Sequence, residues 1–246
     1  IQPNKRFVQH YYDRGIDSTE AKYASMVEGM DKSLGDWMTF LDQKKLTENT
    51  VIIFLSDNGG LTDVGRGKKG RNTYNTPLRS GKTSGYEGGL RIPFVVSGLG
   101  KKGSVSHENI IVDDIFPSIL QLTGIIPKEK IQQVDGKSII PIIQGKTSNQ
   151  NRFFTWHHPH MRTNGSQDVQ PFSAIRQGDW KLIFFHKDQH FELYNTRNDL
   201  SEKNNLFNLI PEKGRFLAKK LGEKLRNSNS KMLIDKEKQK EIIYPF

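Results

Sequence analysis

A run of five apolar residues at positions 51–55 places the strongest constraint on the fold of this 246-residue chain. The run is rich in β-branched residues and shows no alternation of apolar and polar side chains, which predicts a strand buried on both faces. In the first 150 residues only one further run, at 92–97, predicts a short buried strand. Such strands need neighbouring strands and covering helices. We therefore expect this region to be the second half of an α/β domain whose first half lies elsewhere.

Two helices are predicted in the same region. Asp17 and Glu20 have the spacing of a capping box, and the helix that they begin is expected to extend to about Leu46. Its apolar residues recur every three or four positions, which places them on one helix face: Tyr23, Val27, Met30, Leu34, Trp37 and Leu41. A second helix is predicted over 114–123, with Gly124 placed to end it.

The pattern changes after about residue 149. Residues 172–177 and 180–185 flank Gly178-Asp179, which predicts a β-hairpin, and a further strand is expected at 191–195. A helix is predicted over 211–227, and no element is assigned after Ser228. Strands followed by a helix indicate a small α+β subdomain. We thus predict an α/β core over 1–148 and a small antiparallel-sheet plus helix subdomain over 149–246.

Composition narrows the classes of function. The chain has no cysteine, so these residues hold no disulfide, thiolate metal site or cysteine nucleophile. No apolar run approaches the roughly 20 residues of a membrane span. The 37 Lys and Arg exceed the 27 Asp and Glu and give a net charge of +10, which is consistent with a polyanionic partner or with a solvated basic surface. The amino-terminal residues 1–4 contain no initiating Met and no signal-like apolar segment, as expected inside a longer polypeptide.

Asp57 and Asn58 directly follow the first predicted strand. Carboxylate and amide oxygens suit a hard cation such as Ca²⁺ or Mg²⁺, and the two glycines behind them allow a tight turn. Asp, Asn and Gly are also common turn residues, so the short segment by itself is equally compatible with a simple turn.

Lys82 lies in a glycine-rich connection, 61–89, whose length suggests a functional loop. Its ammonium group is a candidate anion clamp for a sulfate or phosphate oxygen and for charge that develops on a leaving group. A solvated loop lysine is the alternative. The same connection carries four more cations that could attract a polyanion, namely Arg66, Lys68, Lys69 and Arg71.

Taken together, these segments resemble the type I sulfatases, the formylglycine-dependent arylsulfatase family with an alkaline-phosphatase-like fold. Residues 49–60 are similar to the metal-binding segment of that family, and 77–93 are similar to its next block. Further similar segments lie in the family's order at 23–31, 114–118, 134–138, 174–183 and 192–195. The resemblance covers roughly residues 17–225, and bacterial carbohydrate sulfatases are the most similar group.

The resemblance implies roles for individual residues. Asp57 and Asn58 would be two ligands of a Ca²⁺ ion, with Mg²⁺ the less favoured metal, and Lys82 would contact the sulfate and stabilise the leaving oxygen. Glu87 would shape its loop. The nucleophile motif that gives formylglycine is absent from these residues, as are the family's other metal-binding aspartates and its usual catalytic Lys and His. Formylglycine is therefore expected on a missing N-terminal half, and this segment alone should be inactive.

A histidine-rich stretch, 156–160, adds candidates for substrate binding. Many bacterial carbohydrate sulfatases have a similar stretch beside the mouth of the active site, which implies that His158 and His160 contact a sulfated sugar. A structural or surface role is the alternative, and it is favoured for His157. Arg162 is a weaker candidate, and His107 and His186 are expected to be structural or on the surface.

The sequence thus favours a Ca²⁺-dependent sulfatase that acts on a sulfated carbohydrate and is periplasmic or secreted. A phosphoester or phosphonate hydrolase of the same superfamily and a non-catalytic polyanion-binding protein remain alternatives. We expect neither a nucleic-acid partner nor a membrane span, because no recognised nucleic-acid-binding motif accompanies the charge.

Overall fold

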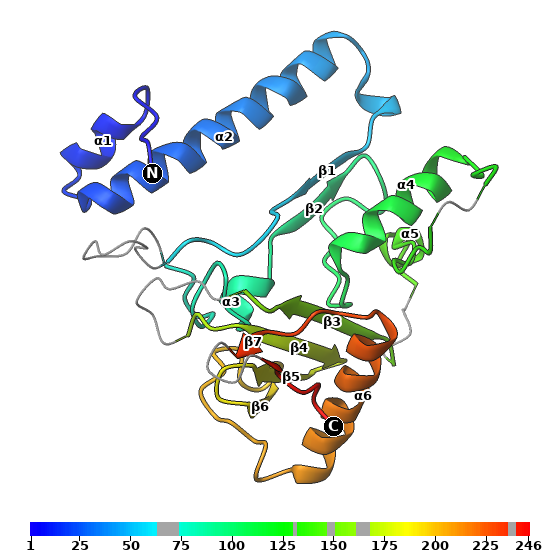
Figure 1. Ribbon diagram of the computed structural model, residues 1–246. Coiled ribbons are helices and arrows are strands. Elements are labelled where there is room, and N and C mark those ends of the chain that lie inside the picture. The colour runs from blue at the N-terminus through cyan, green and yellow to red at the C-terminus, as the bar shows by residue number, and fades with distance from the viewer. Residues whose placement is uncertain (63–73, 130–131, 147–150, 161–167, 236–239) are drawn as a thin grey trace.

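The computed structural model describes residues 1–62, 74–129, 132–146, 151–160, 168–235 and 240–246. The chain forms a two-stranded sheet with helices beside it and, below it in Figure 1, a four-stranded sheet that carries one long helix. The short helix α3 (Glu87–Leu90) lies between the two sheets. Among the helices of the described residues, none combines the length and apolar character that a bilayer crossing requires.

The amino-terminal region is helical. Helix α1 (Val8–Asp13) packs beside the first part of α2 (Ser18–Gln43), and the 3₁₀ turn η1 (Thr47–Asn49) follows. The carboxylate of Asp17 accepts hydrogen bonds from the backbone N–H groups of Thr19 and Glu20, which confirms the predicted helix start. The apolar face of α2 is largely exposed: Trp37 is 64% exposed and Met30 is 49% exposed. The parts of the chain that pack on this helix include α1, η1 and Asn4, whose backbone N–H donates to Ser25 Oγ over 3.0 Å.

Strands β1 (Ile52–Leu55) and β2 (Phe94–Ser97) form an antiparallel pair. The prediction that both strands are buried on both faces was wrong. The β1 residues are only half-buried, and β2 alternates between half-buried and exposed residues, because the described chain places no further strand beside this pair.

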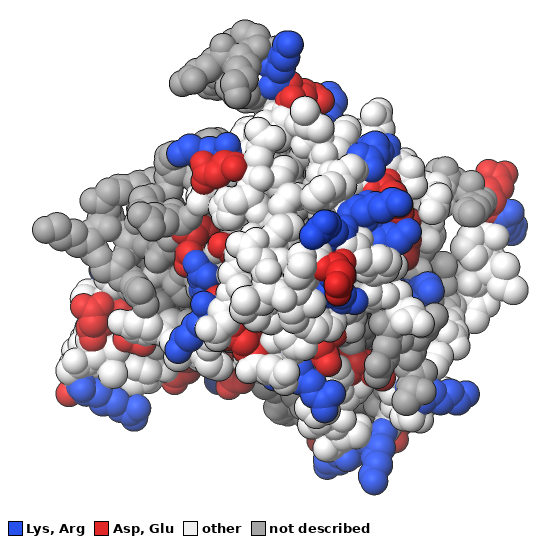
Figure 2. All heavy atoms as spheres, turned by 90° about the horizontal axis from the view of Figure 1, so that it is seen from below, with Lys and Arg blue, Asp and Glu red and all other residues white. Residues whose placement is uncertain are grey.

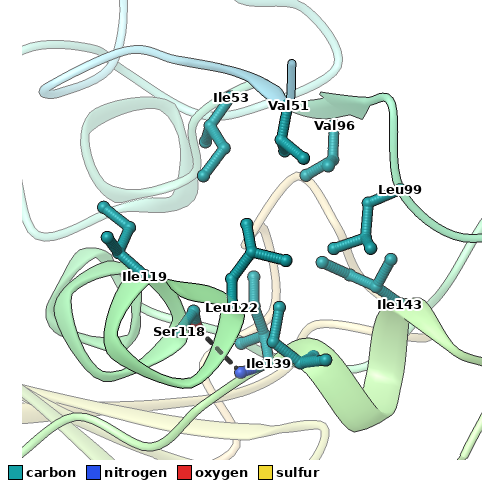
Figure 3. Close-up of a pocket in the computed structure, with 10 residues that line it drawn as sticks. Val51, Ile53, Val96, Leu99, Ser118, Ile119, Leu122, Ile139 and Ile143 are labelled. Atoms are coloured by element: carbon teal, nitrogen blue, oxygen red, sulfur yellow. Dashed lines mark hydrogen bonds between the residues drawn. The ribbon is translucent and has the colours of Figure 1, made fainter. Parts of the chain in front are cut away.

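One side of this pair is covered by apolar side chains from two helices. These are α4 (Ile115–Thr123), which follows the 3₁₀ turn η2 (Val112–Asp114), and α5 (Ile140–Ile143). Figure 3 shows the isoleucine, leucine and valine side chains that converge there and the hydroxyl of Ser118, which accepts a hydrogen bond from the backbone N–H of Ile139. The small gap between them is lined by apolar atoms and forms a packed core rather than a ligand site. Gly124 ends α4 in the left-handed conformation, as predicted.

The second sheet is antiparallel, with its strands in chain order. Its strands are β3 (Phe153–His158), β4 (Phe172–Gln177), β5 (Trp180–Phe185) and β6 (His190–Asn195). The predicted hairpin around Gly178-Asp179 is confirmed residue for residue, whereas β3 was not predicted.

Alternate side chains of this sheet point to opposite faces. Ile175, Leu182 and Leu193 pack on one face against helix α6 (Pro211–Asn227), whose Leu217, Leu221 and Leu225 are fully buried. The other face carries Ala174, Ile183 and Tyr194 and packs against Tyr86, at the start of α3. The tail after Ser228 adds a short pair, β7 (Ile234–Asp235) and β8 (Lys240–Glu241), which was not predicted.

Candidate functional site

The turn after β1 presents two of the predicted site residues. Asp57 is exposed and Asn58 is half-buried, and the Ser56 hydroxyl donates to the Asn58 carbonyl over 2.7 Å. Their side-chain oxygens form no hydrogen bond or ion pair with the residues that the structure describes. They are therefore free to bind a ligand.

A second segment, 75–90, is joined to this turn by its backbone. The N–H of Lys82 donates to the carbonyl of Gly60 over 3.0 Å, and the N–H of Gly59 donates to the carbonyl of Gly89 over 3.0 Å. These bonds bring Lys82 beside the Asp57-Asn58 turn although the residues are 24 or more positions apart. The ammonium group of Lys82, a half-buried residue, forms no ion pair with a described residue.

Glycine is required where the two segments meet. A Cβ atom on Gly59 would lie 1.7 Å from the carbonyl oxygen of Gly88, well inside any possible contact. Since both segments approach through their main chains, a side chain at this position would push them apart.

Asn75, which the sequence analysis did not single out, holds the same junction. Its side-chain N–H groups lie 3.0 Å from the carbonyl of Gly60, 3.1 Å from that of Ser80 and 3.2 Å from that of Gly88. A single asparagine in a loop carries no sequence signal that would distinguish it from an ordinary turn residue.

Arg79 anchors the Lys82 segment to the four-stranded sheet. Its guanidinium lies 2.8 Å from the Asp168 carboxylate and 3.0 Å from the carbonyl of Glu202, and it stacks 3.8 Å from the ring centre of Tyr86. Burial lowers the pKa of Arg79, but the hydrogen bond to Asp168 and the other nearby groups outweigh this effect and keep the pKa above its ordinary value. Arg79 is thus a positioning cation, and Lys82 is left free to meet an anion.

A buried ion network fixes helix α3. The ammonium of Lys181, which is fully buried, lies 3.0 Å from Oε1 of Glu87 and 2.8 Å from Oε1 of Glu202. Oε2 of Glu202 also accepts the backbone N–H of Glu87 over 2.6 Å, and Arg176 lies 3.3 Å from Oε2 of Glu87. Burial raises the pKa of Glu87, but the positive charges of Lys181 and Arg176 lower it by more, so the pKa falls below its ordinary value. Glu87 therefore shapes the loop, as the resemblance implied.

The histidines are divided between the two faces of the sheet. His157 faces α6 and lies 2.8 Å from Ser173 Oγ and 2.8 Å from the Lys231 carbonyl, so it has a structural role. Fully buried His186 lies 2.8 Å from the same Oγ, and burial, followed by the neighbouring His157, lowers its pKa from 6.5 to about 4.

His158 faces the opposite way and contacts Phe172 on the α3 side of the sheet. The exposed residue His160 lies against it, with the ring centres 5.6 Å apart. The structure thus brings the two predicted sugar-contacting histidines together. His107 is exposed. Arg162 and the cationic cluster of Arg66, Lys68, Lys69 and Arg71 lie outside the described residues.

A complete metal site is not formed by the described residues, among which no three His, Asp or Glu side chains converge. Asp57 and Asn58 supply two oxygen ligands, and Ca²⁺ requires six to eight. The donor set therefore fits part of a hard-cation site.

The charge is not gathered into one basic field on the face drawn in Figure 2. Lys and Arg side chains are scattered there among Asp and Glu, with uncharged surface between them. The net charge of +10 thus identifies no polyanion-binding surface on this face.

Comparison with known proteins identifies the family. Residues 2–125 match the family described as Sulfatase, and residues 81–231 match N-sulphoglucosamine sulphohydrolase, C-terminal. A sulfatase of Formosa agariphila is 34% identical over 231 residues, which are 85% of this chain and 39% of that protein. An N-acetylgalactosamine-6-O-sulfatase of Bacteroides thetaiotaomicron is 31% identical over 212 residues, which are 78% of this chain and 39% of that protein.

Solved structures agree on the fold. Ps i-CgsB in complex with k-i-k-neocarrahexaose matches with a TM-score of 0.74 and 24% identity, over 96% of this chain and 50% of that one. A structure in complex with its substrate, D-glucosamine-2-N,6-O-disulfate, matches with a TM-score of 0.64 and 22% identity, over 85% of this chain and 41% of that one. The predicted alkaline-phosphatase-like sulfatase fold is thereby confirmed, and the chain spans about two fifths to one half of these relatives. The chain belongs to the sulfatase family.

Proposed function

We propose that the full-length protein hydrolyses sulfate esters of a sulfated carbohydrate, with this chain supplying part of the metal and sulfate site. The observation that carries the proposal is the backbone junction that places Lys82 beside Asp57 and Asn58. The similarity to an N-acetylgalactosamine-6-O-sulfatase, which is 31% identical, supports the substrate class.

Each of the three residues has a role in this proposal. Asp57 and Asn58 would hold a divalent cation, Ca²⁺ in preference to Mg²⁺, which when bound polarises the sulfate oxygens. Lys82 would bind a sulfate oxygen and stabilise the negative charge that develops on the leaving oxygen. Such a role requires an ammonium group without an ion-pair partner, which holds for Lys82 among the described residues, and a loop that is anchored, here through Arg79.

His158 and His160 are proposed to contact the sugar rather than the sulfate. They lie together on the face of the sheet that carries α3. We further propose that the chain divides into a core over 1–148 and a subdomain over 149–246. Formylglycine and the remaining metal ligands would lie on a segment outside this chain. The proposed location of the protein is periplasmic or secreted.

The metal ligands are tested in the full-length protein with Asp57→Ala, and Asp188→Ala, in the exposed turn before β6, serves as the matched control. Asp57→Ala should abolish sulfate release and also the rise in melting temperature that Ca²⁺ produces over EDTA. The control should retain both. A Ca²⁺-dependent rise that persists in Asp57→Ala would remove this residue from the metal site.

Lys82→Ala should lower kcat by about 10²–10³-fold, as does the loss of a typical charge-stabilising group. The matched control is Lys187→Ala, at an exposed position, and it should leave kcat unchanged. His158→Ala and His160→Ala should weaken binding of the sulfated carbohydrate more than turnover of a small aryl sulfate. Equal loss on both substrates would assign the histidines a structural role.

A further inference from the structure

A groove of about 470 Å³ opens on the C-terminal subdomain, away from the candidate site. This volume is within the range of about 300–1,000 Å³ that is typical of ligand sites. Its lining combines one aromatic ring, two aliphatic side chains and four amide or carboxylate groups, namely Trp180, Leu206, Ile210, Asn195, Asn198, Asp199 and Asn204.

The sheet register separates the groove from the candidate site. Trp180 pairs with Asn195 at one end of the sheet, whereas His158 pairs with Phe172 at the other end. Strands of six residues place these ends about 17 Å apart. Trp180 also packs on the α6 side of the sheet, while His158 and α3 lie on the opposite side.

Local hydrogen bonds hold the polar groups of the groove in place and leave part of each free. Oδ1 of Asn195 accepts the backbone N–H groups of Arg197 and Asn198, each over 3.2 Å, which leaves its side-chain N–H groups available. Oδ2 of Asp199 accepts the backbone N–H groups of Lys203 over 2.9 Å and Asn204 over 2.8 Å, which leaves Oδ1 available.

Two further donors of the groove are unused. The side-chain amide of Asn198 and the indole N–H of Trp180 form no hydrogen bond with a described residue. The lining therefore offers several donors and one acceptor, the Asp199 carboxylate, which its backbone hydrogen bonds hold next to an aromatic surface.

This arrangement suits a ring that is apolar on its faces and bears hydroxyl groups at its edge. A pyranose can lay its C–H groups on the indole while its hydroxyls bond to the amides and the carboxylate. The lining contains no Lys or Arg and one Asp, so it offers no positive charge to pair with a sulfate and favours an uncharged ligand.

We propose that this groove is a second carbohydrate-binding site, which holds an uncharged sugar unit through Trp180, Asn198 and Asp199. That the sugar belongs to the substrate polymer rests on the proposed function, but the binding itself does not. A polymer held at this groove would keep its sulfated units close to the candidate site.

The test is native affinity electrophoresis of the full-length protein in gels that contain desulfated carrageenan, desulfated fucoidan or galactomannan. At least one of these uncharged polysaccharides should retard the wild type. Asn198→Ala, at an exposed position, should weaken that binding at least about fivefold, the effect of one lost hydrogen bond. Asn208→Ala, at a nearby exposed position outside the groove, should leave the binding unchanged.

Trp180→Leu keeps an apolar side chain against α6 but removes the aromatic surface, so it should abolish retardation. Circular dichroism should show that this variant is folded. Absence of retardation by all three polysaccharides, or equal retardation of wild type and both groove variants, would overturn the proposal. Sulfate release from 4-methylumbelliferyl sulfate should be the same in the wild type and the groove variants. A wild type that is retarded but releases no sulfate would refute the proposed function and leave the groove proposal standing.

Discussion

Replacement of Lys181 by methionine tests how the site loop is held to the sheet. The ammonium of Lys181 is fully buried between Glu87 and Glu202, at 3.0 and 2.8 Å. Methionine fills a similar volume but leaves Glu202 buried without a cation, whereas Glu87 keeps Arg176 at 3.3 Å. The variant therefore removes the ion pairs that tie Glu87 and Glu202 to strand β5, while the backbone N–H of Glu87 still donates to Glu202 over 2.6 Å.

Removal of one partner from a buried ion pair costs about 3–5 kcal/mol. For a folding unit of 246 residues each kcal/mol shifts Tm by about 2–4 °C, so this region should melt about 6–20 °C lower in the variant. The matched control is Lys220→Met, because Lys220 pairs with Glu223 over 2.8 Å on the surface of α6 with 37% of its side chain exposed. That pair contributes at most about 1 kcal/mol.

The loss of stability in Lys181→Met should also depend on pH. Burial raises the pKa of Glu202, and Lys181 opposes that rise. Without Lys181 the folded pKa rises further above the unfolded value, so stability is lost as the pH rises through the folded pKa. The variant should thus lie closer to the wild type at pH 5 than at pH 8. Thermal melts of both variants at pH 5 and pH 8 test this expectation. Similar Tm values for Lys181→Met and Lys220→Met would show that the buried ion network does not stabilise the fold.

Three further changes probe other parts of the structure. Burial holds His186 neutral with a pKa of about 4, so the unfolded state binds a proton at a higher pH than the folded state does. Stability should therefore fall by about 3 kcal/mol as the pH drops from 6.5 to 4, and His186→Gln should reduce this fall when the urea midpoint is measured against pH. Gly59→Ala should lower kcat/KM and cost about 1–3 kcal/mol of stability, because the new Cβ would overlap Gly88. The control Gly35→Ala, whose Cβ would meet nothing within 4 Å, should stabilise the protein by about 0.5–1 kcal/mol. Equal effects of the two variants on urea unfolding would contradict the close approach at Gly59. Leu221→Ala in the fully buried face of α6 should cost about 2–5 kcal/mol by urea unfolding, and a loss below 1 kcal/mol would mean that α6 is not packed on the sheet.

Local sequence signals predicted the elements that depend on local chemistry. The cap at Asp17, the stop at Gly124 and the hairpin turn at Gly178-Asp179 each use side-chain or backbone preferences of a few neighbouring residues. The strand β3 was not predicted because its residues, 153–158, show no alternation of apolar and polar side chains and include two histidines, His157 and His158. Each of these two histidines also pairs in register with β4.

Burial was harder to predict than element type. Continuous apolar character at 51–55 indicated a strand covered on both faces, but coverage depends on which elements lie beside it. The same holds for the apolar face of α2, where Met30 and Trp37 remain exposed, although the Trp37 ring contacts Phe40 of the same helix.

The candidate site was predictable as a set of residue types but not as a constellation. Asp57, Asn58 and Lys82 were identified from their chemistry and from family resemblance. Their supports, Asn75 and the network around Lys181, depend on contacts up to 115 positions apart, as between Glu87 and Glu202. Such long-range contacts leave no periodicity in a single sequence.

Ion chromatography of the anion that the full-length wild-type protein releases distinguishes a sulfatase from a phosphatase. The substrates are two matched esters, 4-methylumbelliferyl sulfate and 4-methylumbelliferyl phosphate, and sulfated polysaccharides. The proposed function predicts sulfate from the aryl sulfate and from at least one polysaccharide, with release lost in Asp57→Ala and reduced at least about 100-fold in Lys82→Ala. Release of phosphate in preference to sulfate, or full sulfate release by both variants, would contradict it.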